Sequence, residues 1–405
     1  MRRAPFIRRS WSNMVTRQDI QSAAERIRPF IHRTPLLHSR SLSDMSGADV
    51  YIKAENLQKT GSFKVRGAFN KLGIMETGKV IAASRGNHAQ AVAFAAGILG
   101  IHAKIVMPAN VPIVKEEATK GYGAEVELYG ENLQQALDHA LTQHGFTFVH
   151  PYDDDEIIAG QGTVGLEILE DLENIDCVIV PAGGGGLLAG IARTVKDASP
   201  STQVIGVQTE SAASAFCSFK EKRISQESAL PTLADGIAVG CVGERPFEII
   251  TRYVDDMLLV PEDPIAMAIL IFLERTKFLV EGAGAVPLAA LLESRERFRR
   301  KRVVLVASGG NIDLNLIDRI IQKGLVTSGR LAIFGVTVDD VPGSLHAIAG
   351  IIAGHRGNII TVAHHRLDQE LPVGKTKVIF TIESRTSEHL AQILKGIRAA
   401  GFEVK

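Results

Sequence analysis

Between residues 51 and 325 the sequence alternates short β-rich runs with longer helix-like stretches. Most of these runs lead into Gly, Pro, Ser or Asn, and a helical segment usually follows. A repeated β-α order of this kind predicts an α/β fold, with parallel sheet covered by helices on both faces. The six predicted strands are residues 79–84, 103–107, 124–129, 177–182, 203–208 and 302–308.

Three polar loops directly follow predicted strands. They are Ser84–His88, Gly183–Gly186 and Ser308–Asn311. Parallel sheets place their ligands beyond the carboxyl ends of the strands. These loops are therefore the candidate ligand-binding elements.

A second unit is predicted at residues 330–405. Its pattern reads β-α-β-β-α-β, which is the ferredoxin-like plan. No catalytic cluster is visible in it, so regulation or assembly is the expected role. A short loop at residues 323–330 is the predicted boundary.

The composition excludes several classes of protein. A chain of 405 residues is expected to form two or more domains. Lys+Arg and Asp+Glu both count 45, which gives no global charge for binding nucleic acid or an anionic membrane. No apolar run reaches the roughly 20 residues of a membrane span. The three cysteines, Cys177, Cys217 and Cys241, form no disulfide framework or paired metal motif and favour a reducing, cytoplasmic location.

The N-terminal residues differ from the rest of the chain. They are Arg-rich and free of acids, and they loosely resemble a transit peptide. Because the stretch is short and lacks a clear apolar face, we predict a disordered tail at residues 1–16. An overextended start is the related alternative, with Met14 as the true beginning.

Four consecutive glycines, Gly183 to Gly186, separate an apolar strand from a helix. Their backbone N–H groups can converge without interference from side chains, and the helix adds its positive N-terminal end. This arrangement suits a phosphate ester. No Gly-Lys-Ser/Thr follows, so the segment is not a P-loop. A tight turn that needs glycine is the structural alternative.

Lys64 lies between Phe63 and Val65 in the segment 61–68. A lone lysine is usually a surface residue, and a nucleophilic lysine needs desolvation and a lowered pKa. Only the combination with a phosphate site makes Lys64 a candidate. The Ser84–His88 loop can cap a helix or bind a substrate carboxylate, and Ser308–Asn311 can be a turn or a site.

Taken together, these motifs resemble the fold-type II pyridoxal-phosphate enzymes, and specifically the threonine ammonia-lyases (threonine dehydratases). They occur in the family's order over residues 20–321. The matching segments are Ser62–Ala68, Gly86–Gln90, His150–Asp154, Ala159–Thr163, Gly183–Leu187, Ala234–Gly236, Glu281–Gly284 and Ser308–Asn311. Residues 340–345 and 371–374 are similar to an ACT domain, a module that senses small ligands.

The resemblance implies a fold and a domain organisation. The catalytic domain would span residues 17–325 and contain two parallel-type sheets, with a small subdomain of about residues 53–155 inserted in it. The ACT domain would span residues 330–405 and bind an amino-acid effector at Pro342, Gly343, Ser344 and Leu345. A homo-oligomer, dimer or tetramer, is expected.

The resemblance also assigns roles to single residues. Lys64 would carry pyridoxal 5′-phosphate as a Schiff base and later remove the substrate's Cα proton. Ser308 would face the pyridine nitrogen, and Asn87 the phenolic oxygen. The other cofactor contacts would be Phe63, Gly183, Gly184, Gly185, Gly186 and Leu187. The substrate contacts would be Ser84, Arg85, Gly86, Asn87, His88, Gly236 and Glu281.

The implied reaction is removal of water and then ammonia from L-threonine, and from L-serine as well. A serine hydroxyl does not hold the pyridine nitrogen protonated, so the cofactor is a milder electron sink and elimination is favoured over transamination. The alternatives are a 3-hydroxyaspartate ammonia-lyase, a serine racemase/dehydratase, and a catalytically weak sensor of amino acids. Retention of Lys64, Asn87, the glycine loop and Ser308 argues against the sensor.

Two departures from the family pattern affect these expectations. Arg85 stands where threonine dehydratases usually have a small residue and serine racemases have an acid/base serine. Arginine stays protonated and cannot readily act as that base, which argues against racemisation. It either turns outward or favours an acidic substrate. Gln208 and Ser214 stand where metal-binding relatives tend to have carboxylates, so we expect no divalent metal, while a monovalent cation near Glu281 or Gly236 stays open.

Overall fold

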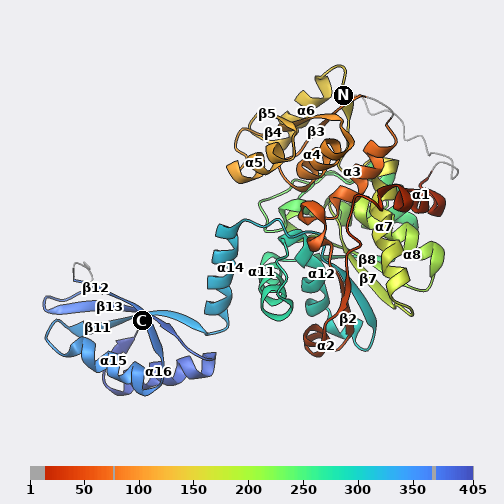
Figure 1. Cartoon of the computed structure of the whole chain (residues 1–405). Coiled ribbons are helices and arrows are strands. Elements are labelled where there is room, and N and C mark those ends of the chain that lie inside the picture. The colour runs from red at the N-terminus through yellow and green to blue at the C-terminus, as the bar shows by residue number, and fades with distance from the viewer. Residues whose placement is uncertain (1–13, 76–77, 367–370, 405) are drawn as a thin grey trace. The chain divides into compact units, whose positions relative to one another are not determined.

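The computed structural model describes residues 14–75, 78–366 and 371–404 (Figure 1). The chain forms two compact units, the first ending at Ile312 and the second beginning at Asp313. Almost all of the tail expected at residues 1–16 lies outside the described residues.

The larger sheet of the first unit has the strand order β1-β2-β10-β7-β8-β9. All neighbours are parallel except β1, which runs antiparallel to β2. Its strands are β1 (Leu36–His38), β2 (Asp49–Lys53), β7 (Cys177–Pro181), β8 (Gln203–Thr209), β9 (Asp256–Val260) and β10 (Arg302–Val306). The strands β7 and β10 are buried almost throughout, as expected for a parallel sheet with both faces covered.

The smaller sheet of this unit is entirely parallel, with the order β5-β4-β3-β6. Its strands are β3 (Lys79–Ala83), β4 (His102–Met107), β5 (Glu125–Leu128) and β6 (Thr147–Phe148). All six strands predicted from sequence are present, and the prediction of parallel α/β sheets is confirmed. The sequence patterns did not reveal β1, β2, β6 and β9.

The helices of the first unit surround these sheets. They are α1 (Arg17–Ile27), α2 (Arg40–Ser46), α3 (Lys64–Gly73), α4 (Asn87–Leu99), α5 (Ile113–Gly121), α6 (Leu133–Thr142), α7 (Asp155–Asp171), α8 (Gly186–Ala198), α9 (Ser214–Glu221), α10 (Glu244–Tyr253), α11 (Glu262–Ile271), α12 (Gly282–Glu293) and α13 (Arg295–Phe298). Within the described ranges, no helix is long and apolar enough to cross a bilayer.

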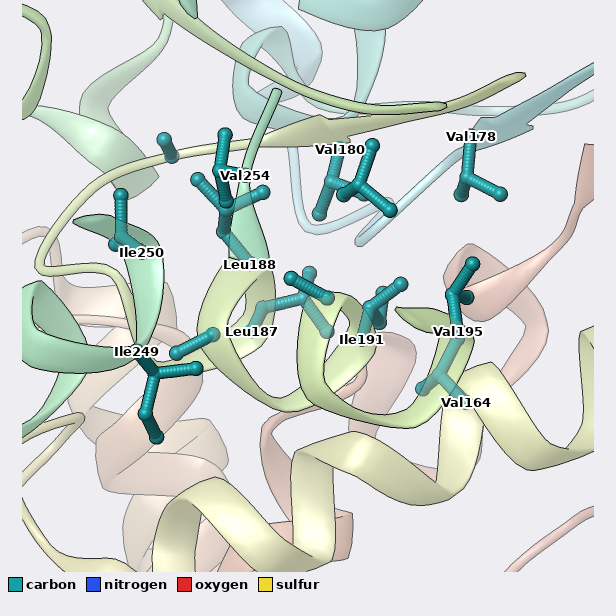
Figure 2. Packing of buried hydrophobic residues seen from close by; sticks show 14 of the residues in the cluster. Val164, Val178, Val180, Leu187, Leu188, Ile191, Val195, Ile249, Ile250 and Val254 are labelled. Carbon is teal, nitrogen blue, oxygen red and sulfur yellow. The ribbon is translucent and has the colours of Figure 1, made fainter. Parts of the chain in front are cut away.

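Helix α8 shows how the sequence builds the core of the large sheet. Leu188, Ile191 and Val195 repeat at helical spacing, so they share one face of the helix. They are fully buried with Val178 and Val180 of β7, and Figure 2 shows these side chains between the helix and the strand. Burying each such side chain stabilises the fold by roughly 1.5–3 kcal/mol. This packing fixes the point where α8 begins, and the glycine loop precedes that point.

A buried network of four charges holds α3 in place. The guanidinium of Arg66 pairs with Glu55 at 2.8 Å and with Glu167 at 2.7 Å. The amine of Lys53 donates to Glu167 at 2.5 Å. All four residues are buried, and the two positive charges balance the two negative ones. Since Arg66 lies two residues after Lys64, this network also fixes the start of the helix that carries the lysine.

The second unit contains an antiparallel sheet with the order β12-β13-β11-β14. Its elements are α14 (Leu314–Thr327), β11 (Leu331–Asp339), α15 (Ser344–Gly354), β12 (Asn358–His365), β13 (Lys375–Glu383), α16 (Ser387–Ala399) and β14 (Glu403–Val404). From β11 onward the order is β-α-β-β-α-β, and the sheet has the ferredoxin-like arrangement that the sequence predicted.

The boundary differs from the predicted one. Residues 323–327 belong to α14 and are not part of a loop, and the division between the units falls after Ile312. Asp313 caps this helix, and the buried side chains of Ile317 and Ile320 lie along one face of it. The apolar positions of this helix were read as the end of the catalytic domain, although they belong to the second unit.

We predict that Arg66→Ala lowers the free energy of unfolding of the chain by about 3–5 kcal/mol, because it leaves Glu55 and Glu167 buried without their main partner. Arg33→Ala is the matched control, since Arg33 also pairs with two carboxylates but its side chain is 52% exposed. The control should cost less than about 1 kcal/mol. Urea unfolding of both variants provides the measurement, and equal losses would contradict the role assigned to the network.

Candidate active site

A cavity of about 430 Å³ lies in the first unit, at the carboxyl ends of strands from both sheets. All three predicted loops line it. The predicted residues around this cavity are Phe63, Lys64, Ser84, Arg85, Gly86, Asn87, His88, Gly183, Gly184, Gly185, Gly186, Leu187, Gly236, Glu281 and Ser308. A larger groove of about 1060 Å³, beside α1 and α7, contains none of them. The structure therefore gathers the predicted cofactor and substrate residues around one space.

Lys64 is the first residue of α3, and its amine donates to the backbone oxygen of Pro151 at 2.9 Å. The entry to the helix is tied to the end of β10, because the amide of Phe63 donates to the backbone oxygen of Ser308 at 3.1 Å. Burial lowers the pKa of the Lys64 ammonium to about 8, while Glu281 acts in the opposite direction. A much larger fraction of this amine is therefore neutral near physiological pH than for an ordinary lysine.

Glu281, Asn87 and Asn311 form a hydrogen-bonded chain across the cavity. The side-chain nitrogen of Asn87 donates to both carboxylate oxygens of Glu281, at 2.8 and 3.0 Å. The amide of Asn311 donates in turn to the side-chain oxygen of Asn87 at 2.8 Å. Burial and the nearby Asp235 raise the pKa of Glu281 to about 7. The sequence placed Asn87 at a cofactor oxygen, whereas its amide here binds Glu281.

The glycine loop joins β7 to α8. Gly185 has a φ of +95° and caps the helix. A Cβ atom on Gly184 would lie 2.3 Å from the ring of Tyr152, so this position has no room for a side chain. The first-turn N–H groups of a helix have no partners within the helix, so those of α8 are available to an anion.

The turn from His150 to Asp153 connects the lysine to the glycine loop. Nδ1 of His150 accepts hydrogen bonds from the amides of Tyr152 and Asp153, at 3.3 and 2.8 Å. Pro151 accepts the Lys64 amine, and the ring of Tyr152 covers Gly184. The sequence motif contained these residues, but no role was assigned to them or to Asn311. Only the fold brings this turn against both other elements.

His88 is a buried histidine whose Nε2 lies 2.9 Å from the backbone oxygen of Val149. Burial lowers its pKa to about 3, and the charge of Lys64 acts in the same direction. A neutral imidazole with its Nε2 proton donated to Val149 cannot serve as a cationic ligand for a carboxylate. The expected contribution of His88 is thus reduced to its backbone N–H in the first turn of α4.

Arg85 is exposed and also lines the cavity. Among the described residues it has no ion-pair or hydrogen-bond partner. Its neighbour Ser84 accepts a hydrogen bond from the amide of Gly86 at 3.3 Å, which shapes the loop before α4. The guanidinium is therefore free to meet a ligand at the edge of the cavity.

The oxygens of Gln208 and Ser214 are engaged by the protein itself. The side-chain oxygen of Gln208 accepts from the amides of Ala215 and Phe216, each at 3.0 Å. The hydroxyl of Ser214 donates to the backbone oxygen of Val239 at 2.6 Å. In the part of the chain that the structure describes, no three His, Cys, Asp or Glu residues are grouped to hold a metal.

Comparison with known proteins gives the class of the chain. The family model for "pyridoxal-phosphate dependent enzyme" matches residues 27–309, which is most of the sequence. The chain therefore belongs to this family of pyridoxal-phosphate dependent enzymes. It is more narrowly a homologue of the threonine ammonia-lyases. It is 46% identical to the L-threonine ammonia-lyase of Thermotoga maritima over 97% of this chain and 99% of that one. Its identity to the enzyme of Geobacter sulfurreducens is 45%, over 95% and 98% of the two chains.

Solved structures agree with this assignment. A bacterial threonine deaminase, from T.th., matches with a TM-score of 0.71 and 44% identity, over 74% of this chain and 99% of that one. The serine racemase of Dictyostelium discoideum matches with a TM-score of 0.70 and 38% identity, over 74% and 99%. The expected fold-type II architecture is confirmed.

The cavity fits pyridoxal phosphate. Lys64 offers a buried amine with a lowered pKa, which is the group that an aldehyde requires. The loop at Gly184 leaves no room for a side chain and precedes a helix N-terminus, which suits a phosphate. Ser308 is buried at the end of β10 and brings a neutral hydroxyl to the same cavity.

We predict that cofactor-free protein takes up pyridoxal phosphate at a rate that rises with pH through a midpoint of about 8, because only the neutral amine of Lys64 reacts. Stopped-flow measurement of the visible absorbance tests this expectation. Glu281→Gln should move the midpoint lower, since the carboxylate raises the pKa of Lys64. A midpoint near the ordinary lysine value of 10.5 would show that the amine is not desolvated.

Proposed function

We propose that this enzyme removes water and then ammonia from L-threonine, yielding 2-oxobutanoate, and that it converts L-serine to pyruvate in the same way. The observation that carries the proposal is the buried amine of Lys64, which shares one cavity with the glycine loop. The relatives named L-threonine ammonia-lyase, at 45–46% identity over nearly the whole chain, support this choice of substrate.

The residues of the cavity divide the work of this reaction. Gly183 to Gly186 and the N-terminus of α8 would hold the phosphate, and the Ser84–His88 loop would hold the α-carboxylate of the substrate. When bound, pyridoxal phosphate withdraws electrons from the bond that breaks at Cα. Lys64 would take the Cα proton, because burial keeps much of its amine neutral.

Ser308 and Glu281 would set the electronic character of the site. A neutral hydroxyl at the pyridine nitrogen does not hold a proton there, which favours loss of the β-hydroxyl over transamination. Glu281 would hold Asn87 in position through two hydrogen bonds. The rival reading as a racemase lacks support, because Arg85 occupies the position of the second acid/base and arginine does not readily release a proton.

We also propose that the second unit binds an amino-acid effector at the turn formed by Pro342, Gly343, Ser344 and Leu345. Gly343 has a φ of +101° and precedes α15, so first-turn N–H groups are available there. The hydroxyl of Ser344 donates to the backbone oxygen of Asp339, which closes the turn.

Titration calorimetry of the whole chain with isoleucine and valine tests this effector proposal. We expect heat of binding that is lost in Ser344→Pro, because the ring removes an N–H group of the first turn. Absence of heat with both amino acids would exclude them as effectors. Unchanged binding in the variant would place the effector elsewhere.

Three further properties are proposals that follow from the resemblance. A monovalent cation beside Glu281 and Gly236 would be revealed by comparing turnover in potassium and choline salts. A homo-oligomer, dimer or tetramer, would be revealed by sedimentation. A cytoplasmic location accords with three free cysteines, and it would be contradicted by finding the protein in an exported fraction.

We predict that the purified enzyme forms 2-oxobutanoate and ammonia in equal amounts from L-threonine. Lys64→Ala should reduce the rate to below about a thousandth, because both the attachment point and the Cα base are lost. Coupled assays of keto acid and ammonia measure both products. Turnover that persists in the variant would assign the base to another residue.

A further inference from the structure

We infer that Arg85 provides a second carboxylate subsite, so that the cavity also accepts β-hydroxy amino acids with a side-chain carboxylate, of which 3-hydroxyaspartate is the simplest. The inference rests on the proposed elimination reaction and names a substrate class for the same site. It makes Arg85 a specificity-determining residue.

The position of Arg85 supports this subsite. It lies between Ser84 and Gly86, in the loop that precedes α4. This loop is the candidate site for the α-carboxylate, and all three residues line the cavity. A substituent on the Cβ of a bound substrate is therefore close to the base of a long and flexible arginine side chain.

The charges around the cavity leave Arg85 without a counterion. Its charged lining residues are Lys64, Arg85, Lys115, Asp235 and Glu281. Lys115 pairs with Asp235 at 3.3 Å. Lys64 and Glu281 attract one another across the cavity. Within the described part of the chain, Arg85 alone of these five has no acidic neighbour.

The two histidines of the cavity do not compete for a substrate carboxylate. Burial lowers the pKa of His88 to about 3 and also lowers the pKa of His150, so both rings are neutral near physiological pH. Nδ1 of His150 already accepts backbone amides, and Nε2 of His88 binds Val149. A second negative charge on the substrate would therefore be met by Arg85.

The chemistry of the guanidinium selects a carboxylate over a methyl group. Arginine presents five N–H donors in a fixed plane, and two of them can bind one carboxylate side by side. The methyl group of threonine offers no acceptor to these donors. Because Arg85 is exposed, its charge stays hydrated when threonine binds, so threonine is still accepted.

The reaction of the dicarboxylate balances without any further reactant. The Cα–H bond breaks and the proton passes to Lys64. The Cβ–O bond breaks, and its electron pair leaves with the oxygen, which takes a proton to become water. Addition of water to the resulting enamine, after it tautomerises to the imine, releases ammonia and oxaloacetate. No oxidant or reductant is needed.

The experiment compares wild type with Arg85→Ala, Arg85→Lys and the control Arg40→Ala, which removes an exposed arginine of the same unit that lies outside the cavity. Arg85→Ala should lower kcat/KM for 3-hydroxyaspartate by about tenfold or more, as for loss of a charge-assisted pair. The value for L-threonine should change by less than about threefold. Arg85→Lys should fall between, and Arg40→Ala should match wild type.

Binding of unreactive acids gives a readout that does not depend on turnover. Calorimetry with the holoenzyme should show tighter binding of succinate than of butanoate in wild type, and this preference should disappear in Arg85→Ala. The inference is overturned if wild type shows no preference for succinate or does not turn over 3-hydroxyaspartate. Equal losses for both substrates in Arg85→Ala would also overturn it, by assigning Arg85 to the α-carboxylate. Failure on every β-hydroxy amino acid, with the succinate preference intact, would instead count against the proposed reaction alone.

Discussion

The buried pairing of Arg66 with Glu55 and Glu167 is the interaction on which the rest of the site depends. Taking charges out of water is costly, and the cost is offset only when each charge meets a partner in good geometry. Lys53 supplies the second positive charge that makes the cluster neutral. Because α3 begins at Lys64, the cluster that holds this helix also determines where the reactive amine lies.

Burial has a different effect at each ionisable group of the cavity. It moves the pKa of Lys64 down to about 8 and the pKa of Glu281 up to about 7. These two opposite shifts have one cause, since desolvation penalises the charged form of both groups. The result is a lysine that can act as a nucleophile and a base near neutral pH. Arg85, at the exposed edge, keeps its charge and so suits recognition instead of proton transfer.

The sequence predicted the parts of the structure that local patterns determine. The apolar runs at β3, β4, β5, β7, β8 and β10 and the loops that follow them were identified correctly, because a buried parallel strand has a recognisable composition. Interactions between distant segments were not predictable in the same way. The binding of Asn87 to Glu281 joins residues 194 positions apart, and the cover of Tyr152 over Gly184 depends on where a turn meets a strand end. The unit boundary was misplaced because α14 continues the helical periodicity of the catalytic unit without a break in composition.

The central claim is that Lys64 is the residue to which the cofactor is attached. Lys115 also lines the cavity and is the natural alternative. Reduction of the holoenzyme with borohydride, followed by peptide mass mapping, distinguishes the two lysines directly. We predict that the mass of the reduced cofactor appears on the peptide containing Lys64 and on no other peptide. Its appearance on Lys115, or on no lysine of a fully loaded enzyme, would contradict the account.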